Sequence, residues 1–324
     1  MNNFKKIGLT ALAASLVSTS VFAGEMSVSG TASMSYENYS IDGGALSNAK
    51  YFTQNNNITF SGGGELDNGL TVALSFELDD GYNNSTASTS VWDDHSLTIS
   101  SDSLGTFGIY GHGGSSAQKQ YSGTVAGNIW DNFDGTAGVT ATRKASKSGD
   151  NLLKYKLPTF VDDLSMSVSY QPGGTADAGA QSSKAVGIEY TGIEGLTASY
   201  GQGDDNSNTV NKIDVSSWKA SYVYESITVG ASRNDYKPTT ANTDEETTSM
   251  NIAYTVSDSI SVAYGTESIS NEANTTDSEY SSLSGSYTSG GMTISVGHQT
   301  AEAGAGASSD KDVDYNYLTL AFAF

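Results

Sequence analysis

The chain contains no cysteine among its 324 residues. That absence excludes disulfide bonds, a thiol nucleophile and any metal site built from thiolates. Proline is scarce, with three residues, whereas glycine occurs 36 times and serine, threonine and asparagine are spread along the whole length. Stability must therefore come from packing and hydrogen bonding rather than from covalent cross-links.

Positive charge is also in short supply. Fifteen lysines and arginines stand against 36 aspartates and glutamates, which gives a formal net charge of −21 at pH 7. A chain this acidic repels the nucleic-acid backbone, so no nucleic-acid partner is expected. The charges form no long block of one sign, and 19 tyrosines are present, so the composition does not indicate wholesale disorder.

Long apolar runs are confined to residues 1–23. This segment has Lys5 and Lys6 near its start, an apolar middle, and Val-Phe-Ala before Gly24. These are the features of a secretory signal peptide, and they predict cleavage between Ala23 and Gly24 and export from the cytoplasm. The alternative is a transmembrane anchor, which needs about 20 apolar residues and for which this run is short.

Apolar and polar residues alternate with a period of two through the rest of the chain. In "LTVALSFEL" (70–78), leucine, valine and phenylalanine occupy the even positions, and threonine, alanine, serine and glutamate the odd ones. The segments 26–36, 164–170 and 292–299 behave alike. The pattern predicts β-strands with one apolar face and one face of small polar residues, and little helical spacing competes with it.

Short and long connections alternate between these expected strands. Seven short turns, rich in Asp, Glu, Gly or Ser, each precede a strand. Eight longer polar connections separate them, at roughly 40–50, 80–93, 113–149, 171–184, 203–216, 235–247, 269–278 and 300–312. Seven short and eight long connections join about sixteen strands.

This rhythm favours a membrane barrel over a soluble sandwich. Membrane barrels of bacteria have an even number of strands, with short turns at one end and long loops at the other. A soluble surface would carry more Lys and Glu than the small neutral residues found here. Because lipid cannot pair with backbone groups, the sheet must close. The expected fold class is all-β, a closed antiparallel transmembrane barrel with short periplasmic turns and long extracellular loops over residues 24–324.

The segment "YNYLTLAFAF" is expected to be the closing strand, with Leu318, Leu320, Phe322 and Phe324 facing lipid. Together with the N-terminal segment, the hairpin rhythm and one outsized loop, it makes the chain resemble a general diffusion porin of Gram-negative outer membranes, of the alphaproteobacterial type. The resemblance implies a passive, non-enzymatic channel for small hydrophilic solutes and ions. It also implies a homotrimer in the outer membrane, contact with lipid and lipopolysaccharide, and an assembly signal at Phe322 and Phe324 for the barrel assembly machinery.

The longest connection, 113–149, is the third long loop, and the resemblance implies that it folds into the lumen and narrows it. Acidic residues lie at its centre, and basic residues gather in 143–156. In "NLLKYKLP" the alternation places leucine and tyrosine toward lipid and Lys154 and Lys156 toward the lumen. The residues expected at a charged constriction are Asp131, Asp134 and Glu77 on the acidic side and Arg143, Lys144, Lys154 and Lys156 on the basic side.

Two interpretations of these charges stay open at the level of the sequence. They are either solvated loop charges or opposed groups across the narrowest point of the pore. Opposed charges in a confined aqueous pore create a transverse field, which orients polar solutes and disfavours apolar ones.

Aromatic residues recur near the expected strand ends and predict girdles at the two membrane interfaces. They are Tyr36, Tyr39, Tyr170, Tyr190, Tyr200, Tyr222, Tyr254, Tyr264, Tyr287 and Trp218.

Motifs of catalysis and of tight metal binding are missing. The dipeptide Gly-Lys of phosphate-binding loops does not occur. The segment 204–209 lacks the glycine and the later glutamate of a calcium hand, so calcium is expected at most loosely in acidic loops. Two alternatives to a pore remain: an adhesin that binds through its long loops, and a barrel hydrolase that uses His95 or His112 in a Ser–His–acid group.

Deletion of Phe324 tests the expected closing strand. We expect a lower yield of folded, heat-modifiable barrel with secretion through the inner membrane intact, because the aromatic ring would lie at the lipid boundary. Outer-membrane fractionation with and without heating measures this, and unchanged levels of the deletion variant would contradict it.

Overall fold

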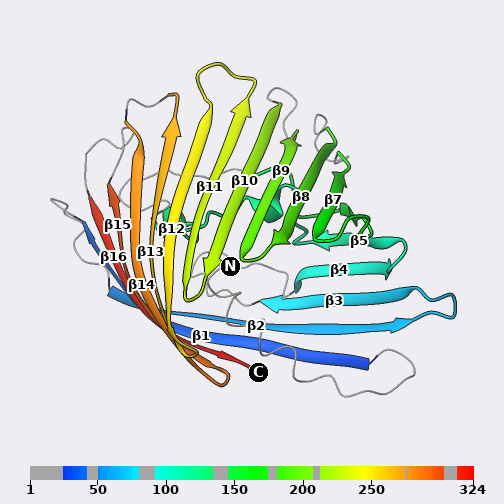
Figure 1. Cartoon of the computed structure of the whole chain (residues 1–324), viewed down its shortest axis with the longest axis horizontal. Coiled ribbons are helices and arrows are strands. Elements are labelled where there is room, and N and C mark those ends of the chain that lie inside the picture. Colours follow the sequence, from blue (N-terminus) through cyan, green and yellow to red (C-terminus); the bar gives the residue numbers. More distant parts are fainter. Residues whose placement is uncertain are drawn as a thin grey trace.

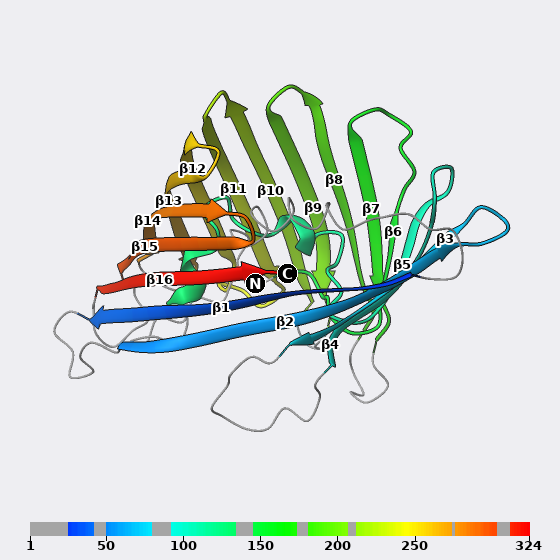
Figure 2. The ribbon, with the colours of Figure 1, turned by 90° about the horizontal axis from the view of Figure 1, so that it is seen from below.

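A closed antiparallel barrel is the whole architecture of the described chain. The computed structural model describes residues 25–41, 50–79, 92–133, 145–173, 181–206, 212–273, 276–302 and 312–324. Sixteen strands pair in chain order within these ranges, and β1 (Glu25–Ile41) closes the ring against β16 (Val313–Ala323). Figures 1 and 2 show the strongly tilted wall that results. The predicted fold class is confirmed.

The strands between these two follow one another around the wall. They are β2 (Lys50–Glu65), β3 (Thr71–Asp79), β4 (Trp92–Ser101), β5 (Gly105–His112), β6 (Leu152–Lys156), β7 (Leu164–Gln171), β8 (Ser183–Ile193), β9 (Leu196–Asp205), β10 (Ile213–Tyr224), β11 (Ile227–Pro238), β12 (Glu245–Ser257), β13 (Ile260–Asn271), β14 (Ser278–Ser289) and β15 (Met292–Glu302).

The closing pair is the expected C-terminal strand against the first one. Met34 lies opposite Leu320, and Tyr36 lies opposite Leu318. The pairing ends where the backbone N–H of Gly30 donates to the carbonyl of Phe324 at 2.8 Å and the N–H of Phe324 donates back to Gly30 at 3.1 Å. The last residue therefore continues the ladder, which closes the barrel from Gly30 to Ile41 of β1.

The two faces of the wall differ as the alternation predicts. Large apolar side chains such as Phe52 (72% exposed) and Met250 (67% exposed) point outward, whereas serines such as Ser169 and Ser217 point inward. None of the helices in the described ranges is long and apolar enough to cross a membrane. In most soluble domains such apolar groups would be buried, so their outward position fits a lipid environment.

One residue of the predicted aromatic girdles was assigned to the wrong face. Tyr39 points into the lumen, where its ring packs on Tyr315 with a centroid separation of 4.5 Å. It has the opposite parity to Tyr36 on the same strand, and Tyr36 packs outside against Phe52. Aromatic character alone does not distinguish the faces, because both tyrosines lie near one end of β1.

The strands extend further toward the long-loop side than the alternation suggests. β11 runs to Pro238 and β12 begins at Glu245, inside the connection expected at 235–247. Outward residues there are polar, as with Asp235 and Glu246, so apolar alternation stops before the pairing does. The alternation of apolar residues therefore indicates only the part of each strand that lies in the apolar band of the wall. The hydrogen-bonded pairing of the strands continues beyond that part.

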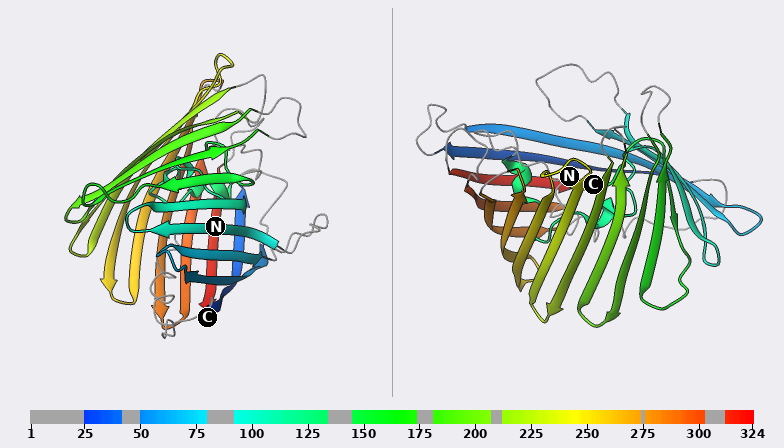
Figure 3. Two further views of the ribbon diagram at one scale, coloured as in Figure 1. Left: turned by 90° about the vertical axis from the view of Figure 1, so that its right-hand side faces the viewer. Right: turned by 90° about the horizontal axis from the view of Figure 1, so that it is seen from above.

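The described part of the third loop lies inside the barrel, as expected. β5 and β6 are short, with 8 and 5 residues, so the chain leaves the wall early. It then forms two single-turn 3₁₀ helices, η2 (Lys119–Tyr121) and η3 (Ile129–Asn132), which contact β9 and β10 and then β13 and β14. Figure 3 shows these helices enclosed by the strands.

Candidate functional site

Residues 116–133 form a lumenal strap, held by hydroxyl groups of the wall. The backbone N–H of Ala117 donates to Ser169 Oγ of β7 at 2.9 Å. The N–H groups of Val125 and Ala126 donate, each at 3.1 Å, to Ser232 Oγ of β11 and Ser249 Oγ of β12. Irregular backbone inside a barrel needs such partners, and the small polar residues of the lumen provide them.

Gln118 joins both arms of the third loop to the wall. Its side chain is fully buried. Its Nε2 donates to Ser217 Oγ of β10 at 2.6 Å, and its Oε1 accepts from the N–H of Ser146 at 2.7 Å. The returning arm of the loop is therefore fixed through the same amide as the strap.

Two glycines of the wall permit this close approach. A Cβ on Gly187 of β8 would overlap the carbonyl oxygen of Ala117, and one on Gly201 of β9 would lie 2.8 Å from Cα of Gln118. Any larger residue would push the strap away from the strands, so glycine here serves backbone-to-backbone contact.

Glu267 of β13 is the charged anchor of the strap. Its carboxylate accepts a hydrogen bond from Thr124 Oγ1 and another from the backbone N–H of Trp130 at 3.1 Å. The residue is 3% exposed. Hydrogen bonds to a buried carboxylate are stronger than neutral ones, so this residue fixes the middle of the strap.

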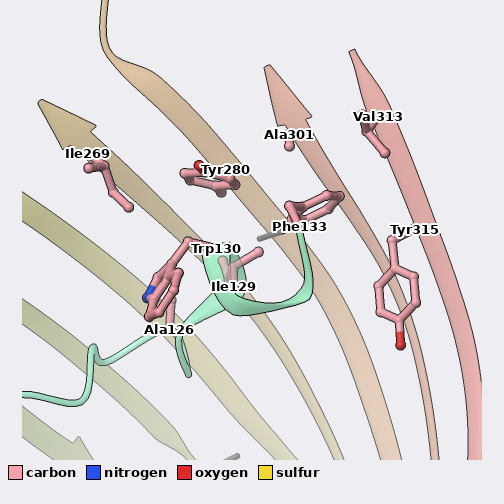
Figure 4. Packing of buried hydrophobic residues seen from close by; sticks show 9 residues of the cluster. All are labelled: Ala126, Ile129, Trp130, Phe133, Ile269, Tyr280, Ala301, Val313 and Tyr315. Carbon is pink, nitrogen blue, oxygen red and sulfur yellow. The ribbon is translucent and has the colours of Figure 1, made fainter. Parts of the chain in front are cut away.

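The far end of the strap packs into an apolar cluster within the lumen (Figure 4). Ile129, Trp130 and Phe133 contact residues of β13–β16, and Phe133 lies 5.8 Å from Tyr280 and 6.3 Å from Tyr315 between ring centroids. Asn132 Nδ2 also donates to Gln299 Oε1 at 2.8 Å. The strap thus ends in a cluster of buried apolar side chains.

Lysines line the wall at the other end of the strap. Lys154 and Lys156 of β6 and Lys219 of β10 border a cavity of about 460 Å³, together with Gln120 of the strap and Glu189 of β8. Lys154 Nζ donates to Gln120 Oε1 at 2.5 Å. Among described residues, neither Lys154 nor Lys156 forms an ion pair. Their charges therefore act on the water and solutes of this cavity.

Tyr121 borders the same cavity from the strap. Burial raises the pKa of its hydroxyl to about 12, and the charge of Glu189 acts in the same direction. The phenol is therefore neutral at physiological pH, and the positive charges of this cavity come from the wall.

The acidic residues expected at the constriction form no ion pair with Lys154 or Lys156 within the described ranges. Asp131 is exposed on η3, at the far end of the strap from Lys154. Glu77 is on the wall in β3 and accepts a hydrogen bond from Asn57 Nδ2 at 2.8 Å. The structure brings Lys154 and Lys156 together but places neither in ion-pair contact with Asp131 or Glu77. Asp134, Arg143 and Lys144 lie outside the described residues.

His112 and His298 lie on different faces of the barrel wall and have different polar neighbours. His112, at the end of β5, has Nδ1 at 3.2 Å from Asp93 and 3.5 Å from Asp94, and Nε2 at 3.5 Å from Asp150. Calcium prefers oxygen ligands, so an imidazole at the centre of this group does not fit the loosely bound calcium expected in acidic loops. On the outer face, His298 Nδ1 lies 2.9 Å from Asn316 Oδ1.

Lys219 and Glu267 were not identified from the sequence. Alternation around Trp218 and Ala220 would have placed Lys219 in the lumen, but nothing local links it to β6, four strands away. The role of Glu267 depends on where the strap crosses β13, and no local pattern contains that information.

The fold of this chain has counterparts among known proteins. A family model described as Gram-negative porin matches residues 8–318. The anion-selective porin from Comamonas acidovorans superposes with a TM-score of 0.73 at 14% identity, over 93% of this chain and 100% of that one. OmpT of Vibrio cholerae, in trimer form, gives 0.66 at 14% identity over 94% and 100%. A mutant of Rh. blastica porin gives 0.65 at 13% over 93% and 100%. No curated protein matches the sequence.

Replacement of Glu267 by alanine is expected to release the strap. Two hydrogen bonds to the carboxylate would be lost, at a cost of roughly 2–3 kcal/mol of docking free energy. Single-channel recordings should show a changed conductance and more open-channel noise. Glu267→Gln keeps an acceptor oxygen and should have the smaller effect. Conductance and noise equal to those of the unaltered protein would show that the carboxylate does not hold the strap.

Proposed function

The chain belongs to the Gram-negative porin family, and from that premise we propose that its ion selectivity depends on charged side chains of the lumen. Lys154, Lys156 and Lys219, which we call the lysine wall, lie on one side, and acidic groups lie on the other side of the lumenal strap. As a porin it is a non-enzymatic diffusion channel of the Gram-negative outer membrane. The observation that carries the proposal is the position of Lys154 and Lys156, which share one lumenal cavity with Lys219 at the start of the strap. The family assignment leaves no support for the hydrolase alternative.

The proposed constriction has a basic and an acidic side. Lys154, Lys156 and Lys219 lie on β6 and β10, whereas Glu77 lies on β3 and Asp131 on the strap. From the sequence alone we add Asp134 to the acidic side and Arg143 and Lys144 to the basic side. Separated charges of opposite sign orient a dipolar solute as it passes, and an apolar solute gains nothing from them.

We further propose a homotrimer of the alphaproteobacterial type. The structurally similar OmpT of Vibrio cholerae is described in a trimer form. In this chain Gln54 and Asn56 point outward from the apolar wall beside Met34 and Ala32. Amides exposed to lipid without partners are costly, so a neighbouring barrel over β1 and β2 would stabilise this face.

Processing and assembly complete the proposal. Cleavage between Ala23 and Gly24, both outside the described residues, would leave residues 24–324 as the porin domain. Phe324 with Phe322 would be read by the barrel assembly machinery, and the outer face would contact lipid and lipopolysaccharide. The ladder between Phe324 and Gly30 supports a closing role for this strand.

Removal of charge from the lysine wall should shift ion selectivity. A unit charge 4–8 Å from a permeant ion contributes roughly 0.5–1 kcal/mol in a water-like medium. Lys154→Gln with Lys156→Gln should therefore raise the cation-to-anion permeability ratio by roughly two- to fivefold, measured as reversal potential across a salt gradient. Lys219→Gln should add to this shift.

Substitutions on the acidic side of the constriction should have the opposite effect on ion selectivity. Asp131→Asn with Asp134→Asn should move the reversal potential toward anions. Because lumenal charges are screened less than charges at the mouth, both shifts should persist when the salt concentration rises. If neither pair changes the reversal potential or the conductance, these residues do not line the constriction.

Cross-linking in mild detergent tests the trimer. We expect a band at three times the mass of the mature chain that disappears on heating. Gln54→Leu with Asn56→Leu should leave the monomer folded, because lipid accepts leucine on this face. Cross-linking that yields monomer alone would contradict the trimer.

A further inference from the structure

Four tyrosine rings meet on the lumenal face where β16, β1 and β2 lie side by side (Figure 2). Tyr39 stacks on Tyr51 at 6.1 Å with an interplanar angle of 13°, and contacts Tyr315 at 4.5 Å. Tyr315 in turn stacks on Tyr317 at 5.6 Å. We call these four residues with Glu37 the tyrosine patch.

The strand register produces this grouping. Tyr39 lies opposite Tyr315, and Glu37 lies opposite Tyr317 on one side and Tyr51 on the other. Directly opposed residues share a face of the sheet, so all five side chains point into the lumen. The patch therefore joins the first two strands of the barrel to the last one.

The strap holds the deeper rings in place. Tyr39 Oη donates to the carbonyl of Asn132 at 2.8 Å, and Tyr315 is 6% exposed beside Phe133. Tyr51, by contrast, is 39% exposed. The strap therefore holds Tyr39 and Tyr315 in place, whereas the ring of Tyr51 is exposed to the water of the lumen.

A single carboxylate lies at the centre of these rings. Glu37 Oε1 accepts from Thr53 Oγ1 at 2.7 Å, and its charge acts on the nearby hydroxyls of Tyr51 and Tyr315. Within the described ranges, no Lys, Arg or His forms an ion pair with Glu37. Asp131, next to Asn132 in sequence, is exposed and adds negative charge on the strap side.

We propose that the tyrosine patch is a binding subsite for organic cations that pass through the pore, such as quaternary ammonium or guanidinium compounds. Tyrosine faces attract cations through the ring quadrupole, and the Glu37 carboxylate, which forms no ion pair within the described ranges, provides the complementary charge. The lysine wall lies on other strands, so an organic cation is drawn to this side of the lumen. The subsite rests on the proposed function, since solutes reach it only through the channel.

Block of potassium current in planar bilayers tests the subsite. The probes are choline and its neutral isostere 3,3-dimethyl-1-butanol, each added to the unaltered protein. We expect choline to reduce the current with a saturating concentration dependence and the isostere to have no such effect. Equal effects of the two probes, or no saturable effect of choline, would overturn the proposal.

Three variants of the patch and one control variant locate the effect. Tyr51→Leu should weaken the block by choline about two- to fivefold, and Tyr51→Phe, which keeps the ring, should retain it. Glu37→Gln should weaken it about fivefold. Tyr287→Leu, which removes an outward ring of β14, is the matched control and should leave the block unchanged.

The outcomes separate this inference from the channel itself. Heat-modifiable migration and normal potassium conductance show that a variant has folded. If conductance is normal and Tyr51→Leu and Glu37→Gln block like the unaltered protein, the subsite is wrong and the channel stands. If the unaltered protein conducts no ions, both proposals fall.

Discussion

Backbone hydrogen bonding is the constraint on which this structure depends. Inside lipid no water is available to pair with N–H and C=O groups, so the sheet has to close through β1 and β16. The same requirement recurs inside the barrel. The strap is irregular backbone, and serine hydroxyls of β7, β11 and β12 accept from its N–H groups.

The small polar lumen therefore has two roles. Its side chains line a water-filled passage, and they also bind the strap through hydrogen bonds. Serines and glycines of the wall let the strap approach closely, and the buried carboxylate of Glu267 and the aromatic cluster around Phe133 fix its position. A lumen of large charged side chains would repel the strap and leave the passage wide.

Charge and aromatic character are divided around the inner wall. Lysines of β6 and β10 lie at the start of the strap, and Glu37 with four tyrosines lies on β16, β1 and β2 near its end. A passing solute therefore meets different chemistry on different sides. This division is possible because each strand contributes only alternate residues to the lumen.

Much of the fold was predictable from the sequence alone. The period of two, the alternation of short and long connections and the closing strand depend on local patterns, and these specify strands, their number and their faces. The lumenal position of Lys154 and Lys156 follows from the same alternation. What only the tertiary structure decided is which residues come together across the barrel: Lys219 and Lys154 at one cavity, Glu267 with Trp130, and Tyr39 with Tyr315. These contacts depend on curvature, register and the path of the strap, which bring together residues far apart in the chain.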